Sequence, residues 1–526
     1  MRHDPLDPVP LPPTLRALVL LVTFLAVGLE LCPILVRAVD FQAELFGEPS
    51  RIGANIVTQD VSTGYVQING GAMGLAAQPV WDFGDGTVQG SWFPAEHTYA
   101  APRSNYIVRV TGRFTDGMTN WTEVLVRFTP PVVVPVPLPA QLAVTIPTND
   151  IALLSRMPGY GFSPTLTHFD DSFFSTKLPR TTVEYVLSVA ATIQNDLANS
   201  NVFLVDGGFG QRVLRDPAAG GMYSIWYSSP VAFGSADYGF QGAPGYSSFF
   251  HEMGHNVTLN FPAGYYYGGK IDGNANAIYS ETLAQIFQHA TAYEILNQAA
   301  AYGLPADLAF DIYQSARSAL GVMRRGYEEY LGTGTNFYSW NNPSTSTDET
   351  FDSFMTLAFK FCAHAETSGQ GYRLPAQRFM RLLAVFNPEL RQQYDQQHDT
   401  PAADQFRATL LVTALSYAFQ SDLRPEFRAL RFPISDTTYD HLMGLIEPAP
   451  RITVVSIEDA GVRVTWTCLT NRSYILETSV QLATSGFTNC SPVIAVPIGF
   501  NGSTTNYLHS GGALSVQRYY RVRLAS

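Results

Sequence analysis

Two histidines, at positions 251 and 255, and a glutamate at position 252 have the spacing of a metal site. The stretch reads His251-Glu252-Met253-Gly254-His255. Residues four apart on a helix project from one face, so both imidazoles could bind one Zn²⁺ ion. Glu252 lies next to the first histidine, where its carboxylate can reach a water on the metal without being a ligand itself. The pattern predicts a zinc-dependent hydrolase with Glu252 as its general base.

The residues around this motif predict a buried helix. Apolar side chains recur there at helical spacing, at Tyr246, Phe249, Phe250, Met253 and Val257. Serines at 247 and 248 can cap the start of such a helix. An accidental match is the alternative to a metal site, and the composition of the chain produces one in at most about 2 % of cases.

A catalytic zinc ion needs a third protein ligand and one open position. In a common arrangement a histidine six residues after His255 supplies it, but that position holds Phe261. Glu281 is the best candidate, because it lies on an apolar-patterned segment, 275–287, that predicts a second helix. The competing candidate is Asp272, in a glycine-rich turn that equally explains an aspartate.

Two histidines from one helix and a glutamate from the next resemble the gluzincin class of zinc metallopeptidases. Further along, residues 421–435 read S-D-L-R-P-E-F-R-A-L-R-F-P-I-S, and this segment is similar to the end of the enhancin-like, mucin-active peptidase family. That family has Trp where this chain has Leu430. The resemblance covers residues 141–447. It implies a zincin-type α/β fold, a Zn²⁺ cofactor, and cleavage of large secreted or surface glycoproteins.

Residues 45–129 predict a separate β-rich module. W-D-F-G-D-G-T over 81–87 is a strand running into an Asp-Gly turn, and H-T-Y over 97–99 precedes an alternating strand at 106–111. Both sequences closely resemble the polycystic kidney disease (PKD) domain, an immunoglobulin-like β-sandwich. The resemblance implies a spacer or a protein- or glycan-binding module, in which His97 is structural rather than a metal ligand.

Two further segments predict export and a domain boundary. Residues 1–38 combine positive charge with a 13-residue apolar run that is short for a membrane span, and they end in a small-residue cleavage site at Ala38. They read as a signal peptide, with an uncleaved membrane anchor as the alternative. Residues 130–140 are rich in proline, which favours an extended, semi-rigid linker.

The pattern between residues 141 and 447 is mixed α/β and then helical. A capping box at 181–184 predicts a helix that ends near Asn199. Strands are expected near 142–146, 202–205, 222–227 and 231–233. Amphipathic segments predict a helical lobe, with helices over 304–331, 350–365, 375–386 and 404–420.

The resemblance suggests a substrate-binding rim at residues 234–242, with an ordinary connecting loop as the alternative. Tyrosines near the motif are candidate donors to a developing oxyanion, and nothing in the sequence selects among Tyr265, Tyr266, Tyr267 and Tyr279. His289 and His364 lie on predicted helices, where core or surface roles are expected for them.

Residues 450–526 are β-rich again and resemble a small fibronectin-like sandwich. Alternating strands are expected at 462–466, 474–477 and 519–524. Cys468 and Cys490 are a pair within this module, and a disulfide between them fits an exported protein. Two free buried thiols are the alternative.

Composition restricts the partners. The 526-residue chain carries a formal net charge of −12 and no basic stripe, which argues against nucleic acid. Charged residues are only 14 %, and the abundance of Gly, Ser, Thr, Asn, Tyr and Pro is common in secreted proteins. We expect a secreted or cell-surface protein that meets a membrane only through residues 1–38, if these are uncleaved.

The sequence therefore predicts an exported zinc endopeptidase that hydrolyses peptide bonds of extracellular proteins or mucin-like glycoproteins. Zn²⁺ is expected on His251, His255 and Glu281, with Glu252 moving the proton. The alternative is a non-catalytic adhesin or glycan-binding protein built on a zincin scaffold, with its β modules on a glycan or cell surface. The intact Glu252 favours the enzyme. A non-peptide substrate stays open, because the motif fixes the water rather than the bond attacked.

Overall fold

The structure is a computed structural model. It describes residues 51–525 apart from the following positions: 103, 150–165, 175–177, 200–210, 219–221, 225–229, 234–245, 261–275, 341–347, 386–398, 447–449, 469–471, 481–486, 498–503 and 515–517. Several expectations lie outside the described residues: the N-terminal segment 1–38, the strand at 202–205, the rim at 234–242, Asp272, and the tyrosines at 265–267.

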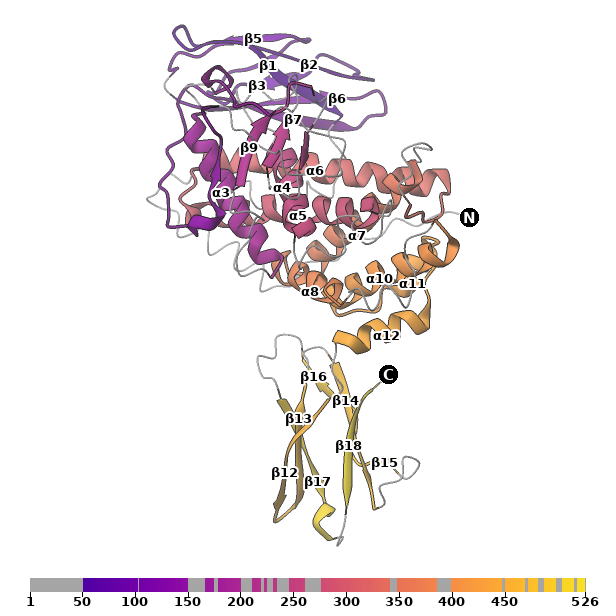
Figure 1. The fold of residues 1–526 in the computed structure, drawn as a ribbon. Coiled ribbons are helices and arrows are strands. Elements are labelled where there is room, and N and C mark those ends of the chain that lie inside the picture. Colours follow the sequence, from indigo (N-terminus) through magenta and orange to yellow (C-terminus); the bar gives the residue numbers. More distant parts are fainter. Residues whose placement is uncertain are drawn as a thin grey trace.

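In the described part of the chain, three separate hydrophobic cores underlie several small sheets and a helical region (Figure 1). The first core lies in the indigo β module, residues 52–128. The second and largest extends from Leu142 to Leu442 through the helical body. The third lies in the yellow C-terminal β module, residues 462–496. The chain is therefore multidomain.

The first β module consists of two antiparallel sheets around one core. One has the order β1 (Ile52–Asp60), β2 (Tyr65–Ala72), β5 (Ala95–Thr98); the other has the order β4 (Val88–Gly90), β3 (Val80–Asp82), β6 (Tyr106–Arg113), β7 (Thr119–Val126). Trp81 is fully buried. The Nε2–H of His97 donates a hydrogen bond to the carboxylate of Asp85 at 2.8 Å, and the His97 ring stacks on Phe83. His97 is therefore part of the turn structure of this module.

A small sheet precedes the helices of the body. Its order is β10 (Met222–Ser224), β11 (Pro230–Phe233), β9 (Gln211–Arg215), β8 (Val144–Thr145). Strands β8, β9 and β11 are parallel, and β10 pairs antiparallel with β11 at one edge. This edge strand lies against the helix that carries the histidine motif.

The helix α3 (Arg180–Leu197) packs against β8, but the predicted capping box is wrong. The helix begins two residues earlier than that box requires, with Pro179 in place of Thr181 at the N-cap and no side-chain cap. Glu184 instead accepts a hydrogen bond from the backbone N–H of Ile146 at 2.7 Å, which ties the helix to the end of β8. Proline has a φ angle that suits a helix start, so the Thr–Glu pair is not needed for that purpose.

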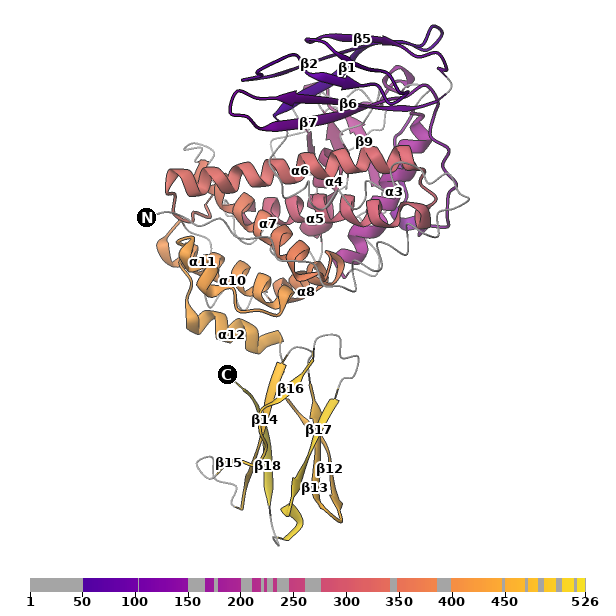
Figure 2. The same ribbon diagram turned by 180° about the vertical axis from the view of Figure 1, so that it is seen from behind.

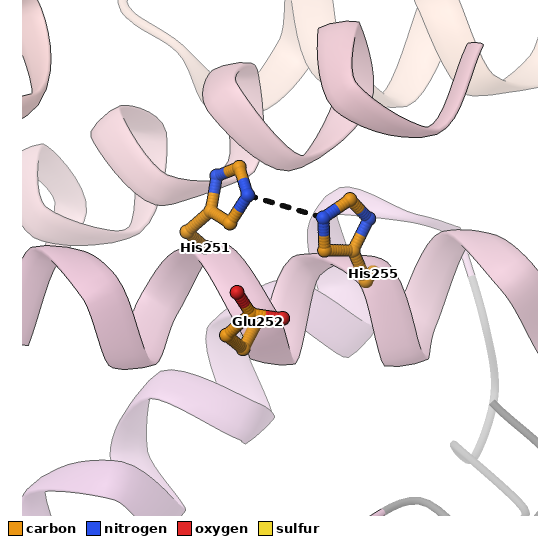
Figure 3. Close-up of side chains that lie close together, drawn as sticks. All are labelled: His251, Glu252 and His255. Carbon is orange, nitrogen blue, oxygen red and sulfur yellow. Dashed lines mark hydrogen bonds between the residues drawn. The ribbon is translucent and has the colours of Figure 1, made fainter. Parts of the chain in front are cut away.

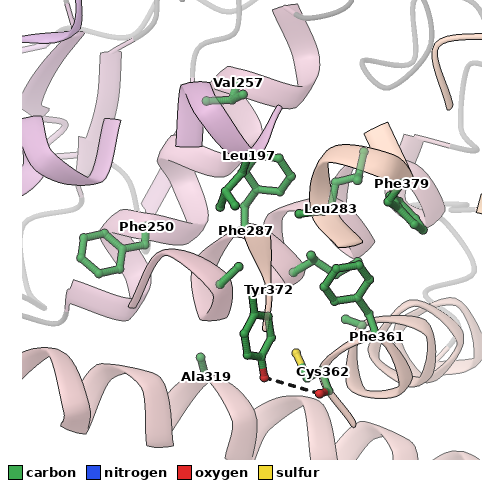
Figure 4. Close-up of a cluster of buried hydrophobic side chains, with 14 of the residues drawn as sticks. Leu197, Phe250, Val257, Leu283, Phe287, Ala319, Phe361, Cys362, Tyr372 and Phe379 are labelled. Atoms are coloured by element: carbon green, nitrogen blue, oxygen red, sulfur yellow. Dashed lines mark hydrogen bonds between the residues drawn. The ribbon is translucent and has the colours of Figure 1, made fainter. Parts of the chain in front are cut away.

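The rest of the body is a stack of helices. They are α4 (Tyr246–Asn260), α5 (Asn276–Gln298), α6 (Ala306–Thr333), α7 (Asp348–Ser368), α8 (Arg373–Leu383), α10 (Pro401–Phe419), α11 (Arg424–Ala429) and α12 (Asp436–Ile446). Helix α5 is central and packs against α3, α4, α6 and α7. Large side chains from several of these helices fill the space between them (Figure 4). None of the helices in the described part of the chain has the length and apolar character needed to cross a bilayer.

The C-terminal module has two sheets, with the orders β12-β13-β17 and β15-β14-β16, and β18 also pairs with β14. The strands are β12 (Ile452–Glu458), β13 (Gly461–Thr467), β14 (Arg472–Ser479), β15 (Thr488–Asn489), β16 (Ile494–Val496), β17 (Thr504–Ser510) and β18 (Tyr519–Leu524). The disulfide expected between Cys468 and Cys490 is absent, and both thiols are free. They follow strands of different sheets, and the Cys490 thiol donates to the backbone oxygen of Leu476 at 3.4 Å.

The first β module lies directly on α6, on the side of the body opposite the C-terminal module (Figures 1 and 2). The proline-rich segment 130–140, which joins this first β module to the body, follows the body closely. The N–H of Val134 donates to the backbone oxygen of Gly303 at 2.9 Å, and the N–H of Val136 donates to the hydroxyl of Tyr185 at 2.9 Å. This segment is therefore attached to the body at two points.

Candidate metal centre

Close packing of α4 against α5 creates the site. Gly254, inside the histidine motif, faces α5: a methyl group at this position would lie 3.2 Å from the Cα of Ala284 and 3.2 Å from the Cβ of Phe287. Met253 and Val257 on α4 are buried in the same core as Leu283 on α5. The absence of a side chain at Gly254 thus lets the two helix backbones approach closely.

Three of the predicted site residues lie together on α4 (Figure 3). His251, Glu252 and His255 each offer a ligand atom, and these atoms all lie within 4.8 Å of one another. The Nε2 atoms of the two histidines are 3.1 Å apart. Glu252 and His255 are buried, and His251 is half-buried.

Glu281 on α5 completes a triangle with the histidines. Its Oε2 atom is 3.3 Å from Nε2 of His251, and its Oε1 atom is 3.4 Å from Nε2 of His255. Atoms bound at about 2.0–2.1 Å to a tetrahedral zinc ion lie about 3.3 Å apart. The separation of the two imidazoles, and the distance from each imidazole to one of the two Glu281 oxygens, are close to that value, so these three side chains could hold a single ion of this size.

The charges of the triangle favour a cation. Burial alone would lower the pKa of His255, but the Glu281 carboxylate outweighs it and raises this pKa to about 9. Burial would raise the pKa of Glu281, but the two imidazoles hold it well below its usual range. Glu281 is therefore an ionised carboxylate, and without a metal His255 holds a proton that a bound ion would have to displace. A carboxylate with two neutral imidazoles is a donor set that suits zinc.

The remaining ring nitrogen of His255 has a partner on α5. Its Nδ1 atom lies 2.7 Å from the hydroxyl of Ser280, and both residues are buried. A hydrogen bond at Nδ1 fixes the orientation of the ring and leaves Nε2 toward Glu281 and His251. Ser280 was not identified from the sequence, although it directly precedes Glu281 on the same helix.

Besides lying close to the two histidines, Glu252 contacts the edge of the small sheet. The hydroxyl of Ser224 on β10 donates to this residue: it lies 3.1 Å from Oε2 of Glu252 and also contacts its backbone oxygen. The sequence predicted a strand over Ser224, which is β10, but no signal identified Ser224 as a neighbour of Glu252.

Among the described residues, Tyr279, His289 and His364 lie in other surroundings. Tyr279 is fully buried in the hydrophobic core. His289 is also fully buried, and its Nε2 atom lies 2.9 Å from the hydroxyl of Tyr372. His364 lies 2.8 Å from the carboxylate of Glu426. His289 and His364 therefore have partners within the fold of the body.

Comparisons with known proteins give only distant likenesses. No family model matches the chain, and no curated protein matches it. A solved structure of a functionally unknown conserved protein (mutant) from Bacillus anthracis str. Ames is similar with 11 % identity and a TM-score of 0.31, over 77 % of this chain and 76 % of that one. The catalytic module of the metalloprotease ZmpA from Clostridium perfringens is similar with 15 % identity and a TM-score of 0.22, over 64 % of this chain and 62 % of that one.

Proposed function

We propose that this chain is a zinc-dependent endopeptidase. The observation that carries the proposal is the triangle of two imidazoles and one carboxylate, with separations of 3.1, 3.3 and 3.4 Å and a further carboxylate next to it. His251, His255 and Glu281 would hold the ion. A bound Zn²⁺ ion supplies an acidified water and polarises a carbonyl group.

The chain's own residues would then carry the proton and orient the ligands. Glu252 is one step from His251 on the same helix, and its carboxylate would accept a proton from the attacking water and donate it to the leaving amine. Ser280 would keep Nε2 of His255 directed into the triangle. The half-buried position of His251 keeps one side of the triangle accessible to a substrate.

The substrate class we propose is an extracellular protein or mucin-like glycoprotein, and the basis for it is the similarity of residues 421–435 to the enhancin-like family. In the fold this segment includes α11 and closes the helical body: Phe427, Leu430 and Phe432 are buried in the main core. Its role in this chain is packing. We further propose that the protein is exported and that the β modules bind the substrate or a cell surface.

The first test is the zinc content of the purified protein, measured by elemental analysis beside Glu281→Ala and Glu252→Gln variants. We expect about one zinc ion per chain in the parent and in Glu252→Gln, and a loss of zinc from Glu281→Ala. Cleavage of fluorescein-labelled casein and labelled gastric mucin should be seen for the parent and be nearly absent for Glu252→Gln.

Other outcomes would redirect the proposal. Full zinc in Glu281→Ala would exclude Glu281 as the third ligand. Zinc binding with equal cleavage by the parent and Glu252→Gln would exclude Glu252 as the base. A folded parent that binds zinc but cleaves neither protein would favour the non-catalytic binding protein.

A further inference from the structure

Ser224 is the side chain through which the small sheet contacts the proposed general base. Its hydroxyl lies 3.1 Å from Oε2 of Glu252 and in direct contact with the backbone oxygen of the same residue. A hydroxyl has one proton, so it donates to one of these oxygens at a time. Both acceptors belong to Glu252, so either donation joins strand β10 to this position of α4.

The fold fixes the place of Ser224. It pairs with Val231 in the antiparallel register of β10 and β11, and Val231 is buried in the main core. Its neighbour Tyr223 donates a hydrogen bond to Asp216 at 2.6 Å, which holds the strand from the other side. The hydroxyl therefore projects from a strand that is held by backbone pairing and by a side chain.

A base works only when its carboxylate is aimed at the proton it takes, and a displacement of about 1 Å can cost a hundredfold in rate. A free glutamate side chain rotates about three bonds, whereas a hydrogen bond to Oε2 restricts the carboxylate and leaves Oε1 for the reaction. The hydroxyl also adds no charge, so it orients the base without neutralising it.

We propose that Ser224 is a positioning residue for Glu252, acting through its hydroxyl on the carboxylate of the base. This inference rests on the proposed peptidase function for its kinetic part. Ser224 has the same relation to the base that Ser280 has to the ligand His255, since each serine approaches α4 from a different neighbouring element. The two serines therefore make separable predictions.

The kinetic experiment compares Ser224→Ala, Ser224→Thr and Ser280→Ala in the full chain, with labelled casein and labelled gastric mucin as probes. We expect Ser224→Ala to lower kcat by about tenfold to a hundredfold, with KM and the zinc dissociation constant unchanged. Ser224→Thr keeps the hydroxyl in a residue that suits a strand, so it should restore most of kcat. Ser280→Ala should instead weaken zinc binding in a chelator competition.

A purely structural role for Ser224 would give another result. Ser224→Ala and Ser224→Thr would then change KM, zinc affinity and thermal stability together, or the alanine variant would keep full kcat. Either outcome would overturn the proposal.

A second measurement does not depend on activity. Ser224→Ala, Glu252→Ala and the double variant form a cycle in which the midpoint of denaturation is measured on the metal-free protein. If the two side chains are coupled, Ser224→Ala should lower the midpoint of denaturation of the parent. The same change should lower it less in the Glu252→Ala background. Additive shifts would refute the coupling of Ser224 to Glu252, whether or not the parent cleaves either probe. A parent that cleaves neither probe would by itself count only against the proposed function.

Discussion

The hydroxyl of Ser280 decides which nitrogen of His255 is available to a metal. Ser280→Ala removes the partner of Nδ1 at 2.7 Å and leaves the ring free to rotate or change tautomer. Such changes next to a ligand typically cost about 10–100-fold in metal affinity. We predict a loss of this size, measured by competition of the purified protein with a zinc chelator.

The matched control is Ser280→Thr, which keeps a hydroxyl at the same place and should bind zinc almost as well as the parent. Equal zinc affinity for the parent and Ser280→Ala would show that the hydrogen bond does not orient the ring. Both variants should keep the helical circular dichroism signal, since each changes one small side chain.

The lowered pKa of Glu426, in the segment 421–435, leads us to predict that the protein loses stability in acid. Burial would raise its pKa, but His364 at 2.8 Å and Lys360 at 2.9 Å lower it to about 2. The folded state therefore holds the ionised carboxylate more strongly than the unfolded state, where the pKa is about 4.3. The resulting stability is fully present above that pH and disappears as the pH falls toward about 2.

Glu426→Gln removes this contribution at every pH. The free energy of unfolding should differ between parent and variant by at most about 1 kcal/mol near pH 6, because the group is partly exposed. The difference should shrink between about pH 4 and pH 2. A difference that grows as the pH falls would have the wrong sign. Urea unfolding of both proteins across this range is the measurement.

Residue types alone predicted much of the candidate site, for reasons specific to helices. His251 and His255 are four apart on a strongly periodic segment, so their common face follows from helical geometry. Glu281 could be proposed because the second helix was visible in the pattern. Ser224 could not, because it reaches Glu252 through strand pairing that no local pattern encodes.

At the scale of elements, Gly254 sets the distance between α4 and α5. Gly254→Ala forces its methyl group against the Ala284 backbone and Phe287, and the helices must separate by a few tenths of an ångström. Overpacking of this kind costs about 1–3 kcal/mol. Because His251 and His255 lie on α4 and Glu281 lies on α5, the same change should also weaken zinc binding.

Gly321 on α6 offers the matched control, because a methyl group there meets no atom within 4 Å. Gly321→Ala should stabilise the protein by up to about 1 kcal/mol, the ordinary helix preference for alanine. Thermal unfolding and chelator competition of both variants test the difference. A Gly254→Ala variant as stable as Gly321→Ala, with normal zinc affinity, would show that the helix spacing is not set by this glycine.

The predicted helices agree with the observed ones where the amphipathic periodicity of the sequence is strong. The differences lie at the ends of the helices. The helix predicted over 404–420 is α10, which begins earlier because Thr400 accepts a hydrogen bond from Ala403 and Pro401 suits the first turn. The capping box at 181–184 was wrong because Pro179 starts that helix. The pairing of Cys468 with Cys490 was wrong: both thiols are free, although both belong to the core of the C-terminal module.

At the scale of the whole molecule, the first β module is fixed to the helical body by a buried charge cluster. The Arg127 side chain, 3 % exposed, contacts the carboxylates of Asp307 and Asp311 on α6. Asn105 donates to Asp307 at 3.2 Å, and the guanidinium of Arg317 lies over the ring of Trp121. The sequence predicted a module and a linker, but not this attachment, because its partners lie about 180 positions apart.

The last prediction concerns this attachment. Arg127→Ala leaves Asp311, which is 1 % exposed, as a buried carboxylate without its arginine. Removing one partner of such a pair costs about 3–5 kcal/mol. Arg51→Ala is the matched control in the same module, because Arg51 and Asp116 form an exposed pair worth at most about 1 kcal/mol.

In denaturant, the parent and Arg51→Ala should unfold their β module together with the helices, whereas Arg127→Ala should lose the module first. Protease cleavage within residues 130–140 should then accelerate only in Arg127→Ala, because a released module leaves this segment held by the hydrogen bonds of Val134 and Val136 alone. Equal stability and equal cleavage in both variants would show that the charge cluster does not hold the module, and that the contacts of the linker alone fix it to the body.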